Sequence, residues 1–135
     1  MALSCTMGPV ANEGAQPAKA ELDYRPAVLE VAADHFVGVD EIEHLLVGVR
    51  DLFRSERLTR DEAVAAMKGL MTSWPPGAVE LLEFTMRDLR WPEVQELLVE
   101  TEREHPDHRA RNQARQVLQV YEPEWPDGEI YWTYR

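Results

Sequence analysis

The chain has 135 residues, of which 44% are hydrophobic and 29% are charged, so its size and composition fit one globular domain with its own core. Asp and Glu number 25 against 14 Lys and Arg, which gives a formal net charge of −11. Such a charge disfavours binding to DNA, RNA or anionic lipid, because nucleic-acid binders place cations on phosphates. It favours a basic protein partner, or serves only to keep the protein soluble.

The chain has a single cysteine, Cys5, so no disulfide can form within it. The N-terminal residues lack the basic start and the apolar run that are typical of a secretory signal. No run approaches the length of about 18 apolar residues that a membrane span needs. These observations predict a cytoplasmic protein without a membrane segment.

Residues 1–20 are rich in Ala, Gly and Pro and show no sustained hydrophobic period, which predicts a flexible N-terminal tail. The pattern becomes helical at about Glu21, and we expect residues 21–135 to form a single helical domain. The first predicted helix ends at Gly38. Its apolar face consists of Val28, Leu29, Ala32, Ala33 and Phe36.

The next two helices have the clearest signals. Asp40 is expected to cap the second helix. The apolar residues of this helix recur at helical spacing: Ile42, Leu45, Leu46, Val49, Leu52 and Phe53. Thr59 and Glu62 form a capping box at the start of the third helix, because each can satisfy a free backbone N–H of the other. Trp74-Pro75-Pro76-Gly77 ends the third helix.

Three further helices are predicted in the C-terminal half. The fourth spans about Ala78 to Leu89 and is apolar on two sides, so we expect it to be the central helix. The fifth begins with Pro92 at its first position and ends before Pro106. Asp107 caps the sixth, which extends to about residue 121. The aromatic end of the chain is expected to be a packed coil or a short helix, because a lone strand would have no partner.

The predicted fold class is therefore all-α, with about six amphipathic helices in antiparallel hairpins that form a compact bundle or a short HEAT-like stack. From Val39 to Val120, the succession of paired helices resembles HEAT-type repeats in architecture, although the sequence has no strict period. The resemblance implies protein binding and indicates nothing about catalysis.

Two Glu-x-x-His spacings are the most enzyme-like feature of the sequence: Glu41 with His44, and Glu102 with His105. Two such pairs on facing helices, with two more carboxylates, build the di-iron site of ferritin-like bundles. Each residue advances about 100° around a helix, so Glu41 and His44 fall away from the apolar stripe that contains Ile42. His105 returns toward the apolar face but lies at a helix end. A metal site from these four residues is therefore a secondary hypothesis.

Other signatures of catalysis are missing from the sequence. It contains no nucleophile elbow, no phosphate-cradling glycine loop and no dinucleotide fingerprint. Cys5 lies in the predicted tail, without a rigid neighbour that would activate it. His105 and His108 flank a proline and an aspartate that a helix stop and a helix cap explain without a metal. We therefore predict no cofactor, no catalytic residue and no enzymatic activity.

Acidic and aromatic residues are unevenly distributed. Residues 21–44 carry seven acids and one base, and residues 93–106 carry five acids and one base. The last eleven residues contain two Trp and two Tyr. An acidic surface with aromatic anchors is suited to docking a cationic protein. The alternative is that the acids are solvated faces and the aromatic residues cover the edge of the protein's own core.

The leading hypothesis is a non-catalytic, acidic helical module that binds a basic protein, such as an inhibitor or immunity-type protein that neutralises a nuclease toxin. The candidate partner-binding residues are Glu93, Glu96, Glu100, Trp125, Tyr131, Trp132 and Tyr134. Two alternatives stay open. One is a small metal-binding protein or enzyme that uses Glu41, His44, Glu102 and His105. The other is a structural subunit of a larger assembly.

Overall fold

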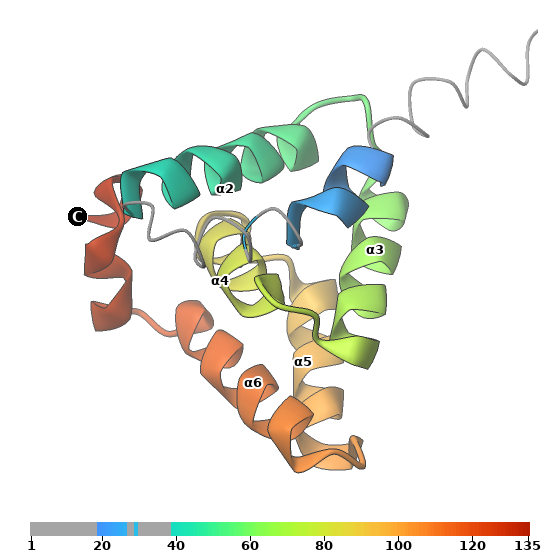
Figure 1. Cartoon of the computed structure of the whole chain (residues 1–135). Helices are drawn as coiled ribbons and strands as arrows, with labels where there is room; N and C mark the ends of the chain where they lie inside the picture. Colours follow the sequence, from blue (N-terminus) through green and yellow to red (C-terminus); the bar gives the residue numbers. More distant parts are fainter. Residues whose placement is uncertain (1–18, 27–28, 30–38) are drawn as a thin grey trace, which may run out of the picture.

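The computed structural model describes residues 19–26, 29 and 39–135, and every regular element in these ranges is helical. The α-helices with complete bounds are α2 (Val39–Arg54), α3 (Arg60–Ser73), α4 (Ala78–Leu89), α5 (Pro92–Glu104) and α6 (His108–Leu118). Three 3-10 helices follow: η1 (Gln119–Tyr121), η2 (Pro126–Ile130) and η3 (Trp132–Tyr134). The prediction of an all-α fold is confirmed (Figure 1).

Much of the predicted N-terminal organisation lies outside the described residues. The predicted tail falls there, except for residues 19 and 20, which already belong to a helical segment. The predicted helix end at Gly38 and most of the first apolar face also lie outside. Leu22 and Leu29, which are described, are both buried, so this part of the chain contributes to the core.

Local capping chemistry explains most of the helix bounds. The hydroxyl of Thr59 accepts from the backbone N–H of Glu62, and the Glu62 carboxylate accepts from the backbone N–H of Thr59, both at 3.1 Å. Asp107 accepts from the backbone N–H of Arg109 at the start of α6, and Pro92 begins α5. One detail differs from the sequence prediction: Asp40 lies inside the first turn of α2 rather than at its cap, because the helix already includes residue 39.

Helix α4 is the centre of the fold, as its two-sided apolar pattern predicts. Eight of its 12 residues are buried. Helices α2 and α6 pack against it, and α3 and η1 contact it as well. Figure 1 shows α4 nearly end-on, below α2 and above α6, with α3 to the right. Among consecutive helices, α5 and α6 pack together most extensively. The arrangement is therefore a compact bundle around α4.

Two arginines of α6 hold the ends of neighbouring helices. Arg109 donates to the carbonyl of Trp74 at the end of α3 at 3.4 Å, and Arg111 donates to the carbonyl of His105 at the end of α5 at 2.7 Å. The last carbonyls of a helix have no partner within the helix, and a cation there also interacts favourably with the helix dipole. The arginines of α6 therefore act as interhelical caps.

No helix among the described residues is both long enough and apolar enough to span a bilayer.

The turn before α4 depends on a glycine. Gly77 has a φ of 85°, in the left-handed region that favours glycine. A Cβ at this position would lie 2.8 Å from both the Cβ of Leu29 and the carbonyl oxygen of Pro26. Pro26 and Leu29 can therefore approach the start of α4 this closely only because residue 77 has no side chain.

We expect Gly77→Ala to lower the free energy of unfolding by about 2 kcal/mol or more, because it adds both backbone strain and a steric clash. Gly69→Ala is the matched control. Gly69 lies inside α3, where a Cβ would meet nothing within 4 Å beyond the helix's own backbone, so alanine there should raise stability by about 0.5–1 kcal/mol. Urea denaturation of the two variants measures both effects. An equal free energy of unfolding for Gly77→Ala and Gly69→Ala would contradict this explanation of the turn.

Candidate functional site

The C-terminal segment (residues 122–135) packs on the protein's own core. Trp125 and Tyr131 are buried, and Tyr131 and Tyr134 contact the ring of Phe84 in α4 edge to face, at centroid distances of 5.2 and 5.1 Å. The hydroxyl of Tyr134 donates to the carbonyl of Phe84. Trp125, Tyr131 and Tyr134 therefore pack as the core-coverage interpretation of the aromatic cluster expects, and their assignment to a partner surface stays a prediction.

Arg87 of α4 holds the first part of this segment. Its guanidinium donates to the carbonyls of Val120, Glu122 and Pro123 at 3.0, 2.6 and 3.1 Å. One cation thus satisfies three backbone carbonyls where the chain leaves η1. The segment is fixed to α4 at this end by a charged donor, which makes stronger hydrogen bonds than a neutral one.

Glu43 of α2 holds the other end. Its carboxylate accepts from the backbone N–H groups of Trp132 at 2.7 Å and Thr133 at 2.8 Å, and from the Thr133 hydroxyl at 2.6 Å. Burial acts to raise the pKa of Glu43, but the hydrogen bonds from Thr133 and Trp132 together outweigh it, so the pKa is lowered from 4.5. The carboxylate therefore stays ionised at neutral pH and caps η3.

Trp132 is the exception among the tryptophans. Its side chain is 65% exposed, whereas Trp74, Trp91 and Trp125 are buried. The neighbouring Ile130 is 53% exposed. The guanidinium of Arg135 lies 4.3 Å from the Trp132 ring centroid. Because the backbone of Trp132 is bonded to Glu43, its exposure does not arise from a frayed end.

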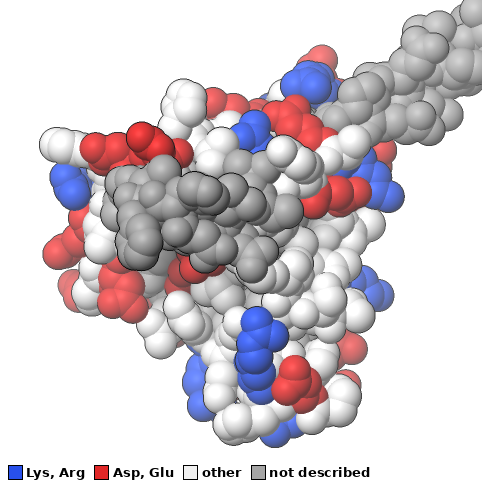
Figure 2. All heavy atoms as spheres, in the orientation of Figure 1, with Lys and Arg blue, Asp and Glu red and all other residues white. Residues whose placement is uncertain are grey.

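Acidic residues precede this exposed pair in the sequence and lie on α2 near the Glu43 anchor. Residues 122–129 carry four acids and no base. Glu129 is exposed next to Ile130, and Asp40 is exposed one helical turn before Glu43. Figure 2 shows acidic side chains gathered over the N-terminal end of α2 and the C-terminal segment. We name Asp40, Glu129, Ile130 and Trp132 the C-terminal surface.

The predicted acidic residues of α5 have separate environments. Glu93 accepts two hydrogen bonds of 2.8 Å from Arg60, which also lies 4.3 Å from the Trp91 ring centroid. The hydrogen bonds from Arg60 lower the pKa of the Glu93 carboxyl. Glu93 therefore joins α3 to α5, and its role as a partner contact stays a prediction. Glu96 and Glu100 are exposed, and neither has an ion pair within the described part of the chain.

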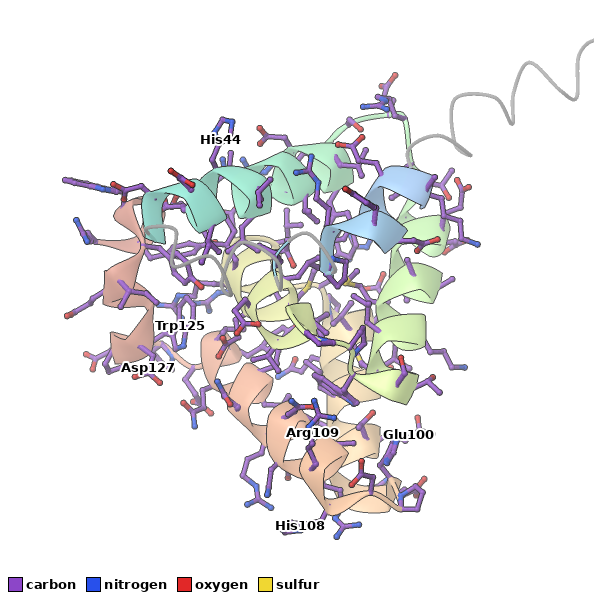
Figure 3. The ribbon with its side chains drawn as sticks, in the orientation of Figure 1. His44, Glu100, His108, Arg109, Trp125 and Asp127 are labelled. Atoms are coloured by element: carbon purple, nitrogen blue, oxygen red, sulfur yellow. The ribbon has the colours of Figure 1, made fainter. Side chains whose placement is uncertain are left out.

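The structure does not bring the predicted acidic residues of α5 and the C-terminal aromatic residues onto one surface. Helix α5 packs against α3 and α6, whereas the C-terminal segment is bonded to α2 and α4. Figure 3 shows Glu100 and Trp125 on different sides of the molecule. Beside Glu100, an open groove of about 320 Å³ runs between α3 and α5, with Lys68 and Leu97 in its lining.

The residues of the secondary metal hypothesis are also apart. Glu41 and His44 are exposed on α2, and Figure 3 shows His44 on its outer side. Glu102 is paired with Arg115 at 3.5 Å, and His105 accepts from the backbone N–H of Asp107 at 3.0 Å. Within the ranges that the structure describes, no three His, Cys, Asp or Glu side chains are grouped to hold a metal. The arrangement therefore gives the metal hypothesis no support.

Sequence reasoning missed two buried carboxylates, Glu43 and Glu83. Glu83 has a visible signal, because it interrupts the apolar run of α4 between Leu82 and Phe84. Glu43 lies at the edge of the apolar stripe of α2, and its partners follow 89 and 90 residues later, so no local pattern indicates its role.

We expect Glu43→Gln to lower the free energy of unfolding by about 1–2 kcal/mol, because a neutral amide replaces a charged acceptor of three hydrogen bonds. The folded pKa of Glu43 lies below 4.5, so this stabilisation is complete above pH 4.5 and is lost as the pH falls through the folded value. The difference between wild type and variant should therefore shrink in acid. Glu41→Gln, on the exposed side of α2, is the control in urea titrations at each pH.

Comparison with known proteins gives no name to these surfaces. No family model, no curated protein and no solved structure matches the chain. The assignment of function therefore rests on the contacts, burial and charges described above.

Proposed function

We propose that the protein is a non-catalytic binding module that captures a basic protein through its C-terminal surface. The observation that carries the proposal is the exposed and fixed side chain of Trp132. The proposal includes a cytoplasmic location and no cofactor. The proposed interface is acidic and aromatic, as expected from the sequence, but it lies at the C-terminal surface and does not include the α5 carboxylates.

An exposed Trp is costly for a protein that does not use it. Trp and Tyr dominate the binding energy of protein interfaces, where large exposed apolar groups become buried. Trp132 and Ile130 are two of the four large apolar residues that are exposed in the described part of the chain. Glu43 holds the backbone at Trp132 before any partner arrives, so binding would lose little conformational entropy there.

The charge distribution supports a basic partner. The formal net charge is −11, and of the 14 basic residues all but Lys19 and Lys68 contact a carboxylate or a backbone carbonyl of the described chain. Bases engaged in this way hold the fold together and leave acidic side chains unbalanced on the surface. Complementary charge raises the association rate and suppresses unsuitable partners.

The most concrete form of the proposal is an inhibitor or immunity-type protein that neutralises a basic partner such as a nuclease toxin. A nuclease is basic where it holds nucleic-acid phosphates, and an acidic helical protein can occupy the same positive surface. Glu102 is paired with Arg115, and His105 and Asp107 accept hydrogen bonds from backbone N–H groups, which is consistent with a structural role for these three residues.

Trp132→Ala tests the proposal. The side chain is mostly exposed, so the free energy of unfolding should change by less than about 0.5 kcal/mol. Affinity for the partner should fall by about thirtyfold or more, as expected for an interface anchor. Val99→Ala is the matched control, because Val99 is a 45% exposed apolar residue on α5. Both variants and the wild type are immobilised, and proteins retained from a lysate of the source organism are quantified at low and high salt.

The expected result is a basic protein that binds wild type and Val99→Ala, is released by salt, and is lost from Trp132→Ala. Equal retention by all three proteins would contradict the proposal. A Glu96→Lys/Glu100→Lys variant tests the other surface, because both carboxylates are exposed on α5. Loss of the partner in this variant, with retention by Trp132→Ala, would place the interface on α5 and overturn the assignment to the C-terminal surface.

A further inference from the structure

A buried carboxylate of α4, Glu83, directly precedes Phe84, whose ring is covered by Tyr131 of the C-terminal segment. Glu83 of α4 is only 7% exposed, and its single hydrogen bond to a described residue comes from the Gln116 amide at 3.5 Å. Glu80 of α4 and Asp127 of η2 are close enough to act on its charge. A buried carboxylate normally has strong hydrogen bonds or a cation beside it. Glu83 has neither within the described residues.

We propose that Glu83 is a pH-sensitive latch, which keeps the span from Trp125 to Tyr131 docked while it is protonated and loosens that span when it ionises. This function is independent of the proposed partner. It concerns how the C-terminal segment is held on the core, so it can be tested on the isolated protein.

The anchors on either side define the span. Arg87 holds the backbone at residues 120–123, and Glu43 holds it at residues 132 and 133. Between these anchors, the chain contacts α4 through aromatic packing rather than charged hydrogen bonds. The span can therefore move away from Glu83 while both of its ends stay attached.

The interior of the span is weakly held by polar groups. The indole Nε1 of Trp125 is buried without a hydrogen-bond partner among the described residues. A buried donor without a partner costs free energy, and water would satisfy it on opening. Gly128 packs closely against the Trp125 ring, since a Cβ at this position would lie 2.3 Å from the ring.

The two carboxylates that act on Glu83 oppose its ionisation, whereas the hydrogen bond from Gln116 favours it. From α4 there is Glu80, from η2 there is Asp127, and from α6 there is the neutral Gln116. Burial, and then the charges of Glu83, Glu80 and Glu43 of α2, raise the pKa of the Tyr131 phenol. Burial first, then the charges of Glu80 and Asp127, raise the pKa of Glu83 to about 7. Ionisation near neutral pH therefore places a third negative charge at this contact.

The sign of the effect follows from proton linkage. The folded protein binds the Glu83 proton more tightly than the unfolded chain, in which the carboxyl has its ordinary pKa of 4.5, and opening of the span shifts the pKa toward that value because water reaches the carboxyl. The protonation of Glu83 therefore makes its full contribution to docking below pH 4.5. This contribution to the free energy of docking is lost as the pH rises to about 7. The equilibrium constant for opening should increase by up to about tenfold per pH unit in this window and then level off.

Amide hydrogen exchange, corrected for the intrinsic pH dependence of exchange, measures this opening. The amides of Gly128 and Tyr131 donate within the span, to Trp125 and Gly128. Their protection should fall between about pH 5 and pH 7, the window that proton linkage sets. The amides of Trp132 and Thr133, which donate to Glu43, and those of α5 should show no such change. An equal fall at all of these amides would indicate global unfolding and overturn the latch.

Two variants distinguish the titration of Glu83 from the effect of the other acidic residues of the segment. Glu83→Gln stays neutral at every pH, so Gly128 and Tyr131 should keep their low-pH protection in mild alkali. Asp127→Asn removes one charge that raises the pKa of Glu83, so the loss of protection should level off at a lower pH and be smaller in total. Glu124→Gln, an exposed acid of the same segment, should leave the transition unchanged. An identical pH profile in wild type and Glu83→Gln, or a Glu83 carboxyl resonance that titrates near 4.5 in the folded protein, would overturn the proposal.

Discussion

The rest of the fold depends on covering α4, which is apolar on more than one side. Two helices, α2 and α6, pack against it, but they leave the ring of Phe84 to be covered by Tyr131 and Tyr134. The C-terminal segment is therefore part of the core. Apolar area alone would hold it loosely, because it consists of short 3-10 turns with few internal hydrogen bonds. The charged clamps of Arg87 and Glu43 fix its position and, with it, the position of the exposed Trp132.

The same clamps explain the electrostatics of the molecule. Its arginines are placed mainly at helix ends, at backbone carbonyls and in ion pairs such as that of Arg60 with Glu93. These contacts link elements that are distant in sequence and use most of the available cations. The acidic residues are more numerous, and in the part of the chain that the structure describes several of them, such as Glu96 and Glu100, have no ion pair. An excess of negative charge therefore remains on the surface, where it can act on other molecules over about a Debye length.

The helices could be predicted from the sequence because their signals are local. The capping box at Thr59, the proline that opens α5 and the cap at Asp107 each involve residues within one helical turn. The candidate site could not be predicted in the same way. Glu93 meets Arg60 across 33 residues, and Glu43 meets Trp132 across 89. Proximity in the sequence therefore predicts one surface for the C-terminal aromatic residues, although the fold buries Trp125 and exposes Trp132.

The clamp between α2 and η3 also has a consequence for synthesis of the protein. Translation proceeds from the N-terminus, so α2 to α6 leave the ribosome before the residues that complete the core. Until residues 125–134 emerge, Phe84 lacks its aromatic cover and the Glu43 carboxylate lacks the N–H groups that it caps. The contact between Glu43 and Trp132 closes a loop of 89 residues. Closing this loop has an entropic cost, which the contacts of the C-terminal segment offset once they form. The contacts of the C-terminal segment with α2 and α4 can therefore form only after the helices that they join have been synthesised.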